Sequence, residues 1–235
     1  MNVVITGASR GIGKSIAEKF AGDGQKHMIL LAARDEQKLA GVAKELQERF
    51  PSSVFHFKAC DLGSKEEAQA FGAWVLDTVT TIDVLINNAG TFVPGNISDE
   101  ADGALENMLE VNLYSAYHLT RSLLPHMISN RSGHIFTICS IAGLQAYPNG
   151  GAYSISKFAL LGFTKNLRHE LKPHNIKVTA VIPGAVYTDS WKGSGVPPER
   201  IMEAEDIAQV VYSVSHLSPQ ATVEEIVMRP QQGDL

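Results

Sequence analysis

Near its start the chain reads Val3-Val4-Ile5-Thr6-Gly7-Ala8-Ser9-Arg10-Gly11-Ile12-Gly13. The apolar run that ends at Thr6 is typical of a buried strand, and Ile12, Ile16 and Phe20 then recur at helical spacing. Glycines therefore lie between a predicted strand and a predicted helix, where backbone N–H groups and the helix N-terminus can face a pyrophosphate. The residues expected at this nucleotide site are Gly7, Ser9, Arg10, Gly11, Ile12 and Gly13.

Strands and helices continue to alternate along the rest of the chain. Apolar runs predict further strands at 28–33, 54–60, 84–87, 134–139, 177–182 and 225–228. Helical periodicity predicts helices at 39–50, 64–79, 105–125, 152–171 and 205–217, with Pro51, Pro125 and Pro173 as stops and a capping box at Ser64 to Glu67. Such alternation requires right-handed crossovers and a parallel, doubly wound sheet of about seven strands. We expect one Rossmann-type α/β domain over 1–235, whose cofactor-binding part lies mainly in 1–140.

The composition is that of one ordinary globular domain. With 44% hydrophobic and 19% charged residues over 235 positions, it excludes disordered, collagen-like and disulfide-rich classes. The formal net charge of −5 argues against nucleic acid or an anionic membrane as partner. No apolar run reaches the length of about 18 residues that a membrane span needs, and no basic leader with a cleavage site opens the chain. A cytoplasmic protein is expected.

Two cysteines, Cys60 and Cys139, are the only ones in the chain. They have neither paired spacing nor a neighbouring cluster of His and Asp, which argues against a metal site or a redox pair. We expect both to be reduced residues of the core.

The segment after the second predicted strand, Ala33-Arg34-Asp35, indicates which nucleotide binds. At this position an acid would bind a ribose 2′-hydroxyl, whereas Arg would bind a 2′-phosphate. Arg34, assisted by Arg10, can form charge-assisted hydrogen bonds to that phosphate, so NADP(H) is favoured over NAD(H). The alternative is that both arginines are solvated surface charges, and a pair between Arg34 and Asp35 would weaken the preference.

Tyr153 and Lys157 lie four residues apart on a predicted helix, and therefore on one face of it. A nearby ammonium favours phenolate over phenol, which makes Tyr153 a usable general acid for a carbonyl oxygen. Ser140 follows the fifth predicted strand, at the sheet edge where ligands bind, and can orient the same carbonyl. Each feature alone has a simpler reading, as a surface pair or a loop-capping serine, so the prediction depends on their combination.

In chain order, these residues resemble the pattern of the classical short-chain dehydrogenase/reductase family. The pattern covers nearly the whole chain and comprises Thr6-Gly7-x-x-x-Gly11-x-Gly13, Asn87-Asn88-Ala89-Gly90, Asn112, Ser140, Tyr153-x-x-x-Lys157 and Pro183-Gly184. The resemblance implies an oxidoreductase in which the nicotinamide cofactor supplies the hydride. It also implies a homodimer or homotetramer formed through the helices near 105–129 and 152–171.

The same resemblance implies a role for each matching residue. Tyr153 would donate the proton, Ser140 would orient the carbonyl, Lys157 would bind the nicotinamide ribose and favour the phenolate, and Asn112 would hold a relay water. The further cofactor contacts it implies are Asp61 and Leu62 on the adenine side, Asn88, Ala89 and Gly90 on the ribose side, and Pro183, Gly184, Val186 and Thr188 at the nicotinamide.

A loop-like segment at 187–203, rich in Gly, Ser and Pro in its first part, follows a predicted strand end and is expected to be a substrate lid. The run from Pro183 to Thr188 followed by Trp191, together with the tail at 223–234, resembles bacterial sepiapterin-reductase-like members. Trp191 can stack on a flat heterocycle such as a pterin or anchor the lid on the core. The residues expected to contact the substrate are Ser140, Tyr147, Tyr153 and Trp191.

The leading hypothesis is NADPH-dependent reduction of a small ketone or diketone, with a pterin side chain such as that of sepiapterin included. A 3-oxoacyl-[acyl-carrier-protein] reductase is the alternative, but Arg121, Arg131 and Arg168 are scattered and form no evident stripe for an acidic carrier. A catalytically silent nucleotide-sensing scaffold is a hypothesis of another class. The intact Ser140, Tyr153 and Lys157 disfavour it.

Overall fold

The computed structural model describes residues 1–191 and 195–235. Its parallel strands form one sheet in the order β3-β2-β1-β4-β5-β6-β7. The strands are β1 (Asn2–Thr6), β2 (Met28–Ala33), β3 (Val54–Ala59), β4 (Val84–Asn87), β5 (His134–Ile138), β6 (Lys177–Pro183) and β7 (Glu225–Met228). Since β1 pairs with both β2 and β4, the chain reverses its direction of winding there. The crevice at such a switch point, beyond the carboxyl ends of the strands, is where open α/β sheets bind ligands.

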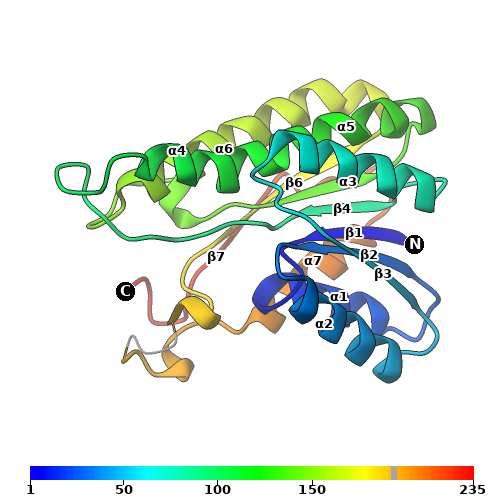
Figure 1. Cartoon of the computed structure of the whole chain (residues 1–235), viewed down its shortest axis with the longest axis horizontal. Coiled ribbons are helices and arrows are strands. Elements are labelled where there is room, and N and C mark those ends of the chain that lie inside the picture. The colour runs from blue at the N-terminus through cyan, green and yellow to red at the C-terminus, as the bar shows by residue number, and fades with distance from the viewer. Residues whose placement is uncertain (192–194) are drawn as a thin grey trace.

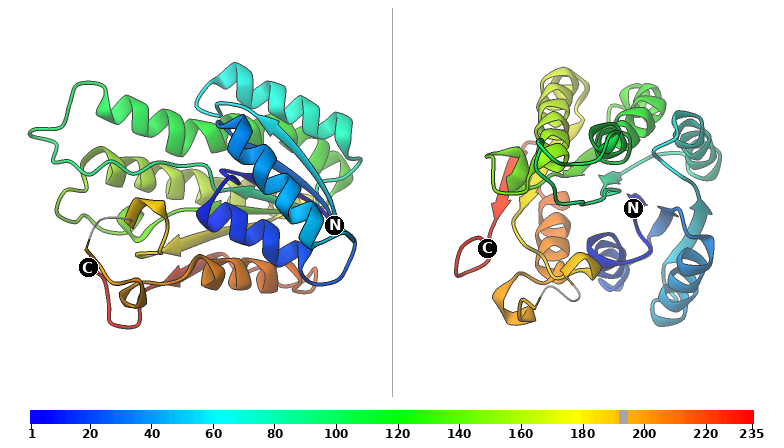
Figure 2. Two further views of the ribbon diagram at one scale, coloured as in Figure 1. Left: turned by 60° about the horizontal axis from the view of Figure 1, so that its bottom comes forward. Right: turned by 60° about the vertical axis from the view of Figure 1, so that its left-hand side comes forward.

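Helices cover both faces of the sheet (Figures 1 and 2). On one face lie α1 (Gly11–Ala21), α2 (Glu36–Arg49) and α7 (Ala204–Ser215), and on the other lie α3 (Lys65–Thr78), α5 (Ser115–Asn130) and α6 (Gly151–Leu171), with the short α4 (Ala104–Leu109) before α5. Successive strand residues point to opposite faces. Val3 and Ile5 therefore pack with α1 and Phe20, whereas Val4 packs with Phe71 of α3. The predicted doubly wound fold of seven strands is confirmed, and both cysteines are buried and free, as expected.

The helix predicted to end at Pro125 continues to Asn130, so that prediction is wrong. A proline inside a helix removes one backbone hydrogen bond, but it does not forbid the helix when packing holds both sides. Leu123 and Met127, one turn apart, are buried on the same apolar face as Leu119. Their burial continues the helix through the proline.

Before α5 the predicted helix is also interrupted, because a π-helical turn, η1 (Glu110–Tyr114), separates α4 from α5. Isolated π-turns inside helices are frequent at functional sites. Asn112, which is fully buried, lies at the centre of this turn.

The capping box predicted at the start of α3 is half right. Ser64 caps the helix by accepting a hydrogen bond from the Glu67 N–H at 3.3 Å. The Glu67 carboxylate does not return to Ser64, whose N–H already donates to the Asp61 carbonyl at 3.0 Å. It accepts instead from the Asp61 N–H at 2.6 Å and so shapes the turn after β3.

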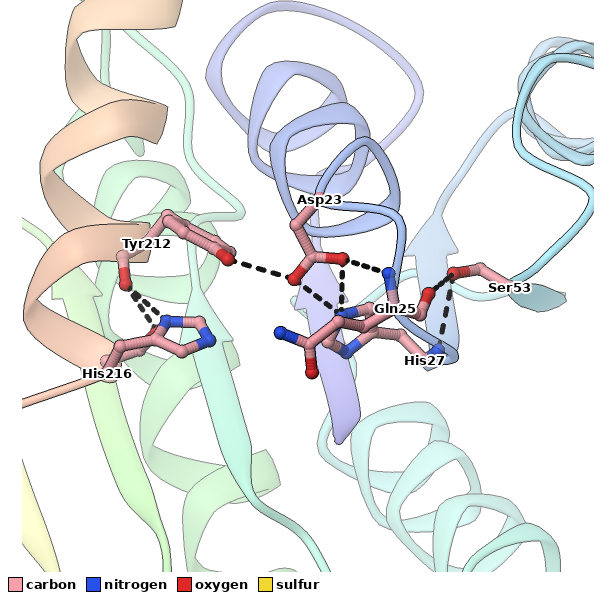
Figure 3. Close-up of polar contacts among 7 residues, drawn as sticks. Asp23, Gln25, His27, Ser53, Tyr212 and His216 are labelled. Carbon is pink, nitrogen blue, oxygen red and sulfur yellow. Dashed lines mark hydrogen bonds and ion pairs between the residues drawn. The ribbon is translucent and has the colours of Figure 1, made fainter.

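A polar cluster fastens the end of α1 to α7, on the side of the molecule away from the carboxyl ends of the strands (Figure 3). The Asp23 carboxylate accepts from the Gln25 N–H at 2.7 Å and the Tyr212 hydroxyl at 2.9 Å, and its other close partner is His27 Nε2, also at 2.9 Å. Burial acts to raise the pKa of Asp23, but hydrogen bonds from Gln25, His27 and Tyr212 outweigh it and lower the pKa below 3.8. The ionised carboxylate is the form that this cluster stabilises.

We predict that Asp23→Asn lowers the free energy of unfolding at pH 7 by about 1–2 kcal/mol, because it removes charge-assisted hydrogen bonds. The folded-state pKa lies below the unfolded one, so this stabilisation is complete above the unfolded value and is lost as the pH falls through the folded value. Urea denaturation of both proteins between pH 7 and about pH 2.5 measures it. A difference that does not shrink in acid would contradict the prediction.

Candidate active site

At three positions of the turn after β1, the backbone conformation or the lack of space favours glycine. Gly7 and Gly11 have φ angles of +63° and +53°, a region that favours glycine. A Cβ on Gly13 would lie 2.5 Å from the Gly7 carbonyl oxygen and 2.6 Å from Asn88 Nδ2. Since α1 starts at Gly11, the turn presents the positive end of a helix to the crevice without obstruction. This backbone surface fits a pyrophosphate.

Thr6, at the end of β1, and Asn88, directly after the neighbouring β4, brace the turn. The Thr6 hydroxyl accepts hydrogen bonds from the N–H groups of Asn88 and Ala89, both at 2.9 Å, and donates to the Ile86 carbonyl at 3.2 Å. Asn88 Nδ2 returns a hydrogen bond to the Thr6 carbonyl at 2.8 Å. The side chain of Asn88 thus supports the turn, and its backbone lies beside it.

Tyr153 and Lys157 extend from α6 toward the carboxyl end of β5. Lys157 Nζ lies 5.8 Å from the centre of the Tyr153 ring and donates to the Ile138 carbonyl at 3.1 Å. Ser140 lies two residues after the end of β5, and its Oγ accepts from the Ala142 N–H at 3.1 Å. Because one lone pair of that oxygen is engaged, its proton remains available for a further acceptor. Lys157 Nζ and Ser140 thus lie at the carboxyl end of β5, and the Tyr153 ring lies beside Lys157.

The amide group of the Asn112 side chain forms hydrogen bonds to other residues of the protein through both its oxygen and its nitrogen. Its Oδ1 accepts from the Thr91 N–H at 2.7 Å, and its Nδ2 donates to the Thr91 carbonyl at 3.0 Å and to the Ser156 hydroxyl at 2.9 Å. Both amide hydrogens are therefore engaged. Gly90 lies against this group, because a Cβ there would be 3.1 Å from Asn112 Oδ1 and 3.7 Å from Lys157 Nζ.

Three residues at this site were missed by sequence reasoning. The Phe92 ring packs edge-on against Tyr153, with 4.8 Å between centroids and 79° between planes, while 44% of the residue stays exposed. Ser154 donates to the Ala142 carbonyl at 2.6 Å and thereby holds the segment after Ser140. Ser156 is the third. Their only sequence signal is position, since they follow Gly90 closely or flank Tyr153.

The motifs assembled at this edge agree with a comparison against known families. Residues 1–196 match the model described as short chain dehydrogenase. The chain belongs to the short-chain dehydrogenase family. It is 32% identical to sepiapterin reductase from Chlorobaculum tepidum, over 99% of this chain and 97% of that protein. It is 33% identical to an uncharacterized oxidoreductase of Staphylococcus saprophyticus, over 97% and 96% of the two chains.

A solved structure shows the same similarity. A metagenomic short-chain oxidoreductase in complex with NADP superposes with a TM-score of 0.83 at 33% identity, over 98% of this chain and 97% of that one. The predicted family, its resemblance to a sepiapterin reductase and the oxidoreductase class are confirmed.

Tyr147 stands near Tyr153 in this short-chain dehydrogenase. Burial raises the pKa of Tyr147 to about 12, and a negative charge on Tyr153 contributes in the same direction. The Tyr147 phenol therefore stays protonated at neutral pH and can donate a hydrogen bond without competing for proton transfer. With 38% of the residue exposed, it can reach a bound molecule.

Arg10 and Arg34, the two cations expected at a 2′-phosphate, lie at the surface. Arg10 forms an ion pair with Asp189 at 3.0 Å, which joins the glycine turn to the turn η4 (Asp189–Trp191). Asp35 does not pair with Arg34, contrary to the alternative raised by the sequence. It caps α2 and pairs with Lys38 at 3.1 Å, because the helix N-terminus attracts its carboxylate.

The two ends of the predicted lid are joined by backbone contacts. Tyr187 donates from its N–H to the Met202 carbonyl at 2.7 Å, beside a bridge between Val186 and Met202. Thr188 lies over the glycine turn, 3.2 Å from where a Cβ of Gly11 would be. The partly buried Trp191 belongs to η4, and 192–194 lie outside the described residues.

The remaining predicted cofactor residues line the same edge. The Asp61 carboxylate accepts from the Gly63 N–H at 3.0 Å, and Leu62 is buried behind it. Pro183 ends β6, and Gly184 donates to the Met228 carbonyl at 2.7 Å.

In the described parts of the chain, no group of His, Cys, Asp or Glu side chains could hold a metal ion. The helices described there are also too short or too polar to cross a membrane.

Proposed function

We propose that this short-chain dehydrogenase uses NADPH to reduce the carbonyl group of a small ketone or diketone to an alcohol. The observation that carries the proposal is that Lys157 Nζ lies 5.8 Å from the centre of the Tyr153 ring and donates to the carbonyl of Ile138, the last residue of β5, two residues before Ser140. The similarity to a sepiapterin reductase and to an oxidoreductase solved with NADP supports it.

The residues present fit a nicotinamide dinucleotide. The glycine turn would hold the pyrophosphate, the exposed Arg34 and Arg10 would hold the 2′-phosphate, and Lys157 would bind the nicotinamide ribose. When bound, the cofactor supplies the hydride. Asp61 and Leu62 would contact the adenine side, and the backbone at Asn88 to Gly90 the ribose side. At the nicotinamide we place Pro183, Gly184, Val186 and Thr188.

The protein's own part in the reaction is proton delivery. The Ser140 hydroxyl would donate to the carbonyl oxygen of the substrate and orient it, and the Tyr153 hydroxyl would give that oxygen its proton. The ammonium of Lys157 stabilises the phenolate that remains. Because both hydrogens of the Asn112 amide are engaged, we place the relay water at the main-chain carbonyl of Asn112.

Aromatic side chains near Tyr153 and in the proposed lid favour a flat substrate. Phe92 and Tyr147 are both partly exposed near Tyr153, and Trp191 lies in the lid. Planar rings bind well between such groups, so our leading substrate class is a pterin whose side chain carries the carbonyl group.

The alternative, a 3-oxoacyl-[acyl-carrier-protein] reductase, needs free basic side chains for its carrier. Arg168 is paired with Glu224 at 2.9 Å, and Arg131 donates to the Pro173 carbonyl at 3.2 Å. Both interactions disfavour a basic docking surface. A silent nucleotide-sensing scaffold is disfavoured by the assembled catalytic residues.

The test is steady-state NADPH oxidation with sepiapterin, a small diketone such as diacetyl, and a 3-oxoacyl thioester as separate substrates. We expect the highest kcat/KM with sepiapterin. Preference for the thioester would select the alternative. Tight binding of NADPH with no turnover of any substrate would overturn the reductase proposal in favour of the scaffold.

Cofactor preference has its own test. Arg34→Ala is expected to weaken NADPH binding about tenfold and leave NADH binding unchanged, because only NADPH carries the 2′-phosphate. Fluorescence titration of both cofactors with wild type and variant measures the two Kd values. An unchanged ratio of the two constants would remove Arg34 from the cofactor site.

We also propose a homodimer or homotetramer, as family resemblance implies, built on the outer faces of α5 and α6. Tyr114, Ile155 and Phe158 are 42%, 40% and 46% exposed on or beside these helices and would supply apolar contact area to a partner. A second copy of the chain would cover them. Analytical ultracentrifugation that finds a monomer at micromolar concentration would reject this assembly.

A further inference from the structure

The hydroxyl of Ser156 lies between two residues of the proposed catalytic group. The side chain is fully buried. Its Oγ donates to the Tyr153 carbonyl at 2.7 Å and accepts from Asn112 Nδ2 at 2.9 Å. Resting on the function proposed above, we propose that Ser156 is a positioning residue that couples the π-turn η1 to the turn of α6 that bears Tyr153.

The hydrogen-bond roles in this network determine one another. Ser156 uses its only proton on the Tyr153 carbonyl, so toward Asn112 it can act only as an acceptor. Asn112 must therefore turn its NH₂ group to Ser156, which leaves Oδ1 to accept from the Thr91 N–H at 2.7 Å. The hydrogen bond to Ser156 and the hydrogen bond from Thr91 therefore require the same orientation of the Asn112 amide. Ser156 thus selects one of the two possible orientations of the buried amide.

The network returns to the catalytic tyrosine through a second path. Thr91 is held at both its N–H and its carbonyl by Asn112, and the next residue, Phe92, packs its ring against that of Tyr153 at 4.8 Å. One end of this path therefore holds the backbone of Tyr153, and the other holds its ring. Loss of the Ser156 hydroxyl leaves one buried amide hydrogen of Asn112 without its acceptor and loosens both ends.

The effect is expected in catalysis more than in cofactor binding. Proton transfer needs the phenol within hydrogen-bond reach of the substrate oxygen, and small misplacements of catalytic groups lower the rate strongly. The contacts of Ser156 lead to Asn112 and Tyr153, whereas the glycine turn is braced separately by Thr6 and Asn88.

The experiment compares Ser156→Ala with Thr164→Val. Thr164 is a matched control, because it is a buried hydroxyl of the same helix that donates to the Leu160 carbonyl at 2.8 Å but has no contact with Asn112 among its described bonds. For Ser156→Ala we expect kcat to fall about tenfold, with the Kd for NADPH within about twofold of wild type and a larger solvent deuterium isotope effect on kcat. Thr164→Val should retain the wild-type values of all three, even if its Tm falls.

Amide hydrogen exchange supplies a readout that needs no turnover. Ser156→Ala should exchange faster than wild type at 91–93 and 110–114, while Thr164→Val should not. Ser156→Thr, which keeps a hydroxyl able to bond the preceding helical turn, should restore most of the kcat. If Ser156→Ala cannot be purified in folded form, Ser156→Thr and Ser156→Cys replace it in the experiment. The Ser156→Cys variant should then retain less activity than the Ser156→Thr variant.

Wild-type kcat and exchange in Ser156→Ala would overturn the inference, as would equal losses in Thr164→Val. Failure of the proposed function has a different signature, because wild type itself would then turn over no ketone. In that case local exchange at 91–93 and 110–114 decides whether Ser156 couples the two turns, and unchanged exchange rejects the coupling.

Discussion

Tyr153→Phe is expected to lower kcat for ketone reduction by about a thousandfold while leaving the Kd for NADPH within about twofold. The substitution removes only the hydroxyl that we propose as the proton donor. The ring remains, so its edge-on contact with Phe92 at 4.8 Å and its place near Lys157 are retained. Steady-state kinetics with sepiapterin, together with fluorescence titration of NADPH, separates the loss of chemistry from a loss of binding.

Tyr147→Phe is the matched control, because it removes a hydroxyl from the neighbouring phenol. Burial raises the pKa of Tyr147 to about 12, so this group is a hydrogen-bond donor and not a source of protons at neutral pH. Its loss should raise KM with a smaller change in kcat. A larger fall in kcat for Tyr147→Phe than for Tyr153→Phe would exchange the two roles and refute our assignment.

Gly13→Val is expected to weaken NADPH binding by at least a hundredfold, since even the Cβ of the new side chain has no space. That atom would lie 2.5 Å from the Gly7 carbonyl oxygen and 2.6 Å from Asn88 Nδ2. The first of these is backbone and cannot rotate away, so the whole glycine turn has to shift. We would measure the Kd by fluorescence titration and check folding by circular dichroism.

Gly41→Ala is the control for replacing a helical glycine. Beyond the backbone of its own helix α2, no atom lies within 4 Å of the place that a Cβ would take, and the residue is exposed. The variant should bind NADPH as wild type does and gain about 0.5–1 kcal/mol in free energy of unfolding, because alanine is the better helix former. Normal NADPH binding by Gly13→Val would show that the turn does not hold the cofactor.

Local patterns predicted most of the fold. Apolar runs identified every strand in the part of the chain that the structure describes, and the glycine turn was found because strand, turn and helix are contiguous in sequence. The errors came where a distant residue competes with the local preference. Pro125 is an example, because the burial of Leu123 and Met127 against the sheet carries α5 past it. Glu67 is another, because its partner is Asp61 and not the predicted Ser64.

The fold class could be predicted from the chain's periodicity, because strands and helices each leave a local pattern of apolar residues. The proposed reactive groups, such as Tyr153 and Lys157, rested on the resemblance to the family and not on their spacing alone. The contacts that hold these groups in place depend on residues far apart in the chain. Thr91 and Asn112 are 21 positions apart, Asn112 and Ser156 are 44, and Arg10 and Asp189 are 179. Such pairs meet because parallel strands bring their carboxyl ends to one edge of the sheet, and no local pattern encodes which side chains then come within hydrogen-bond distance.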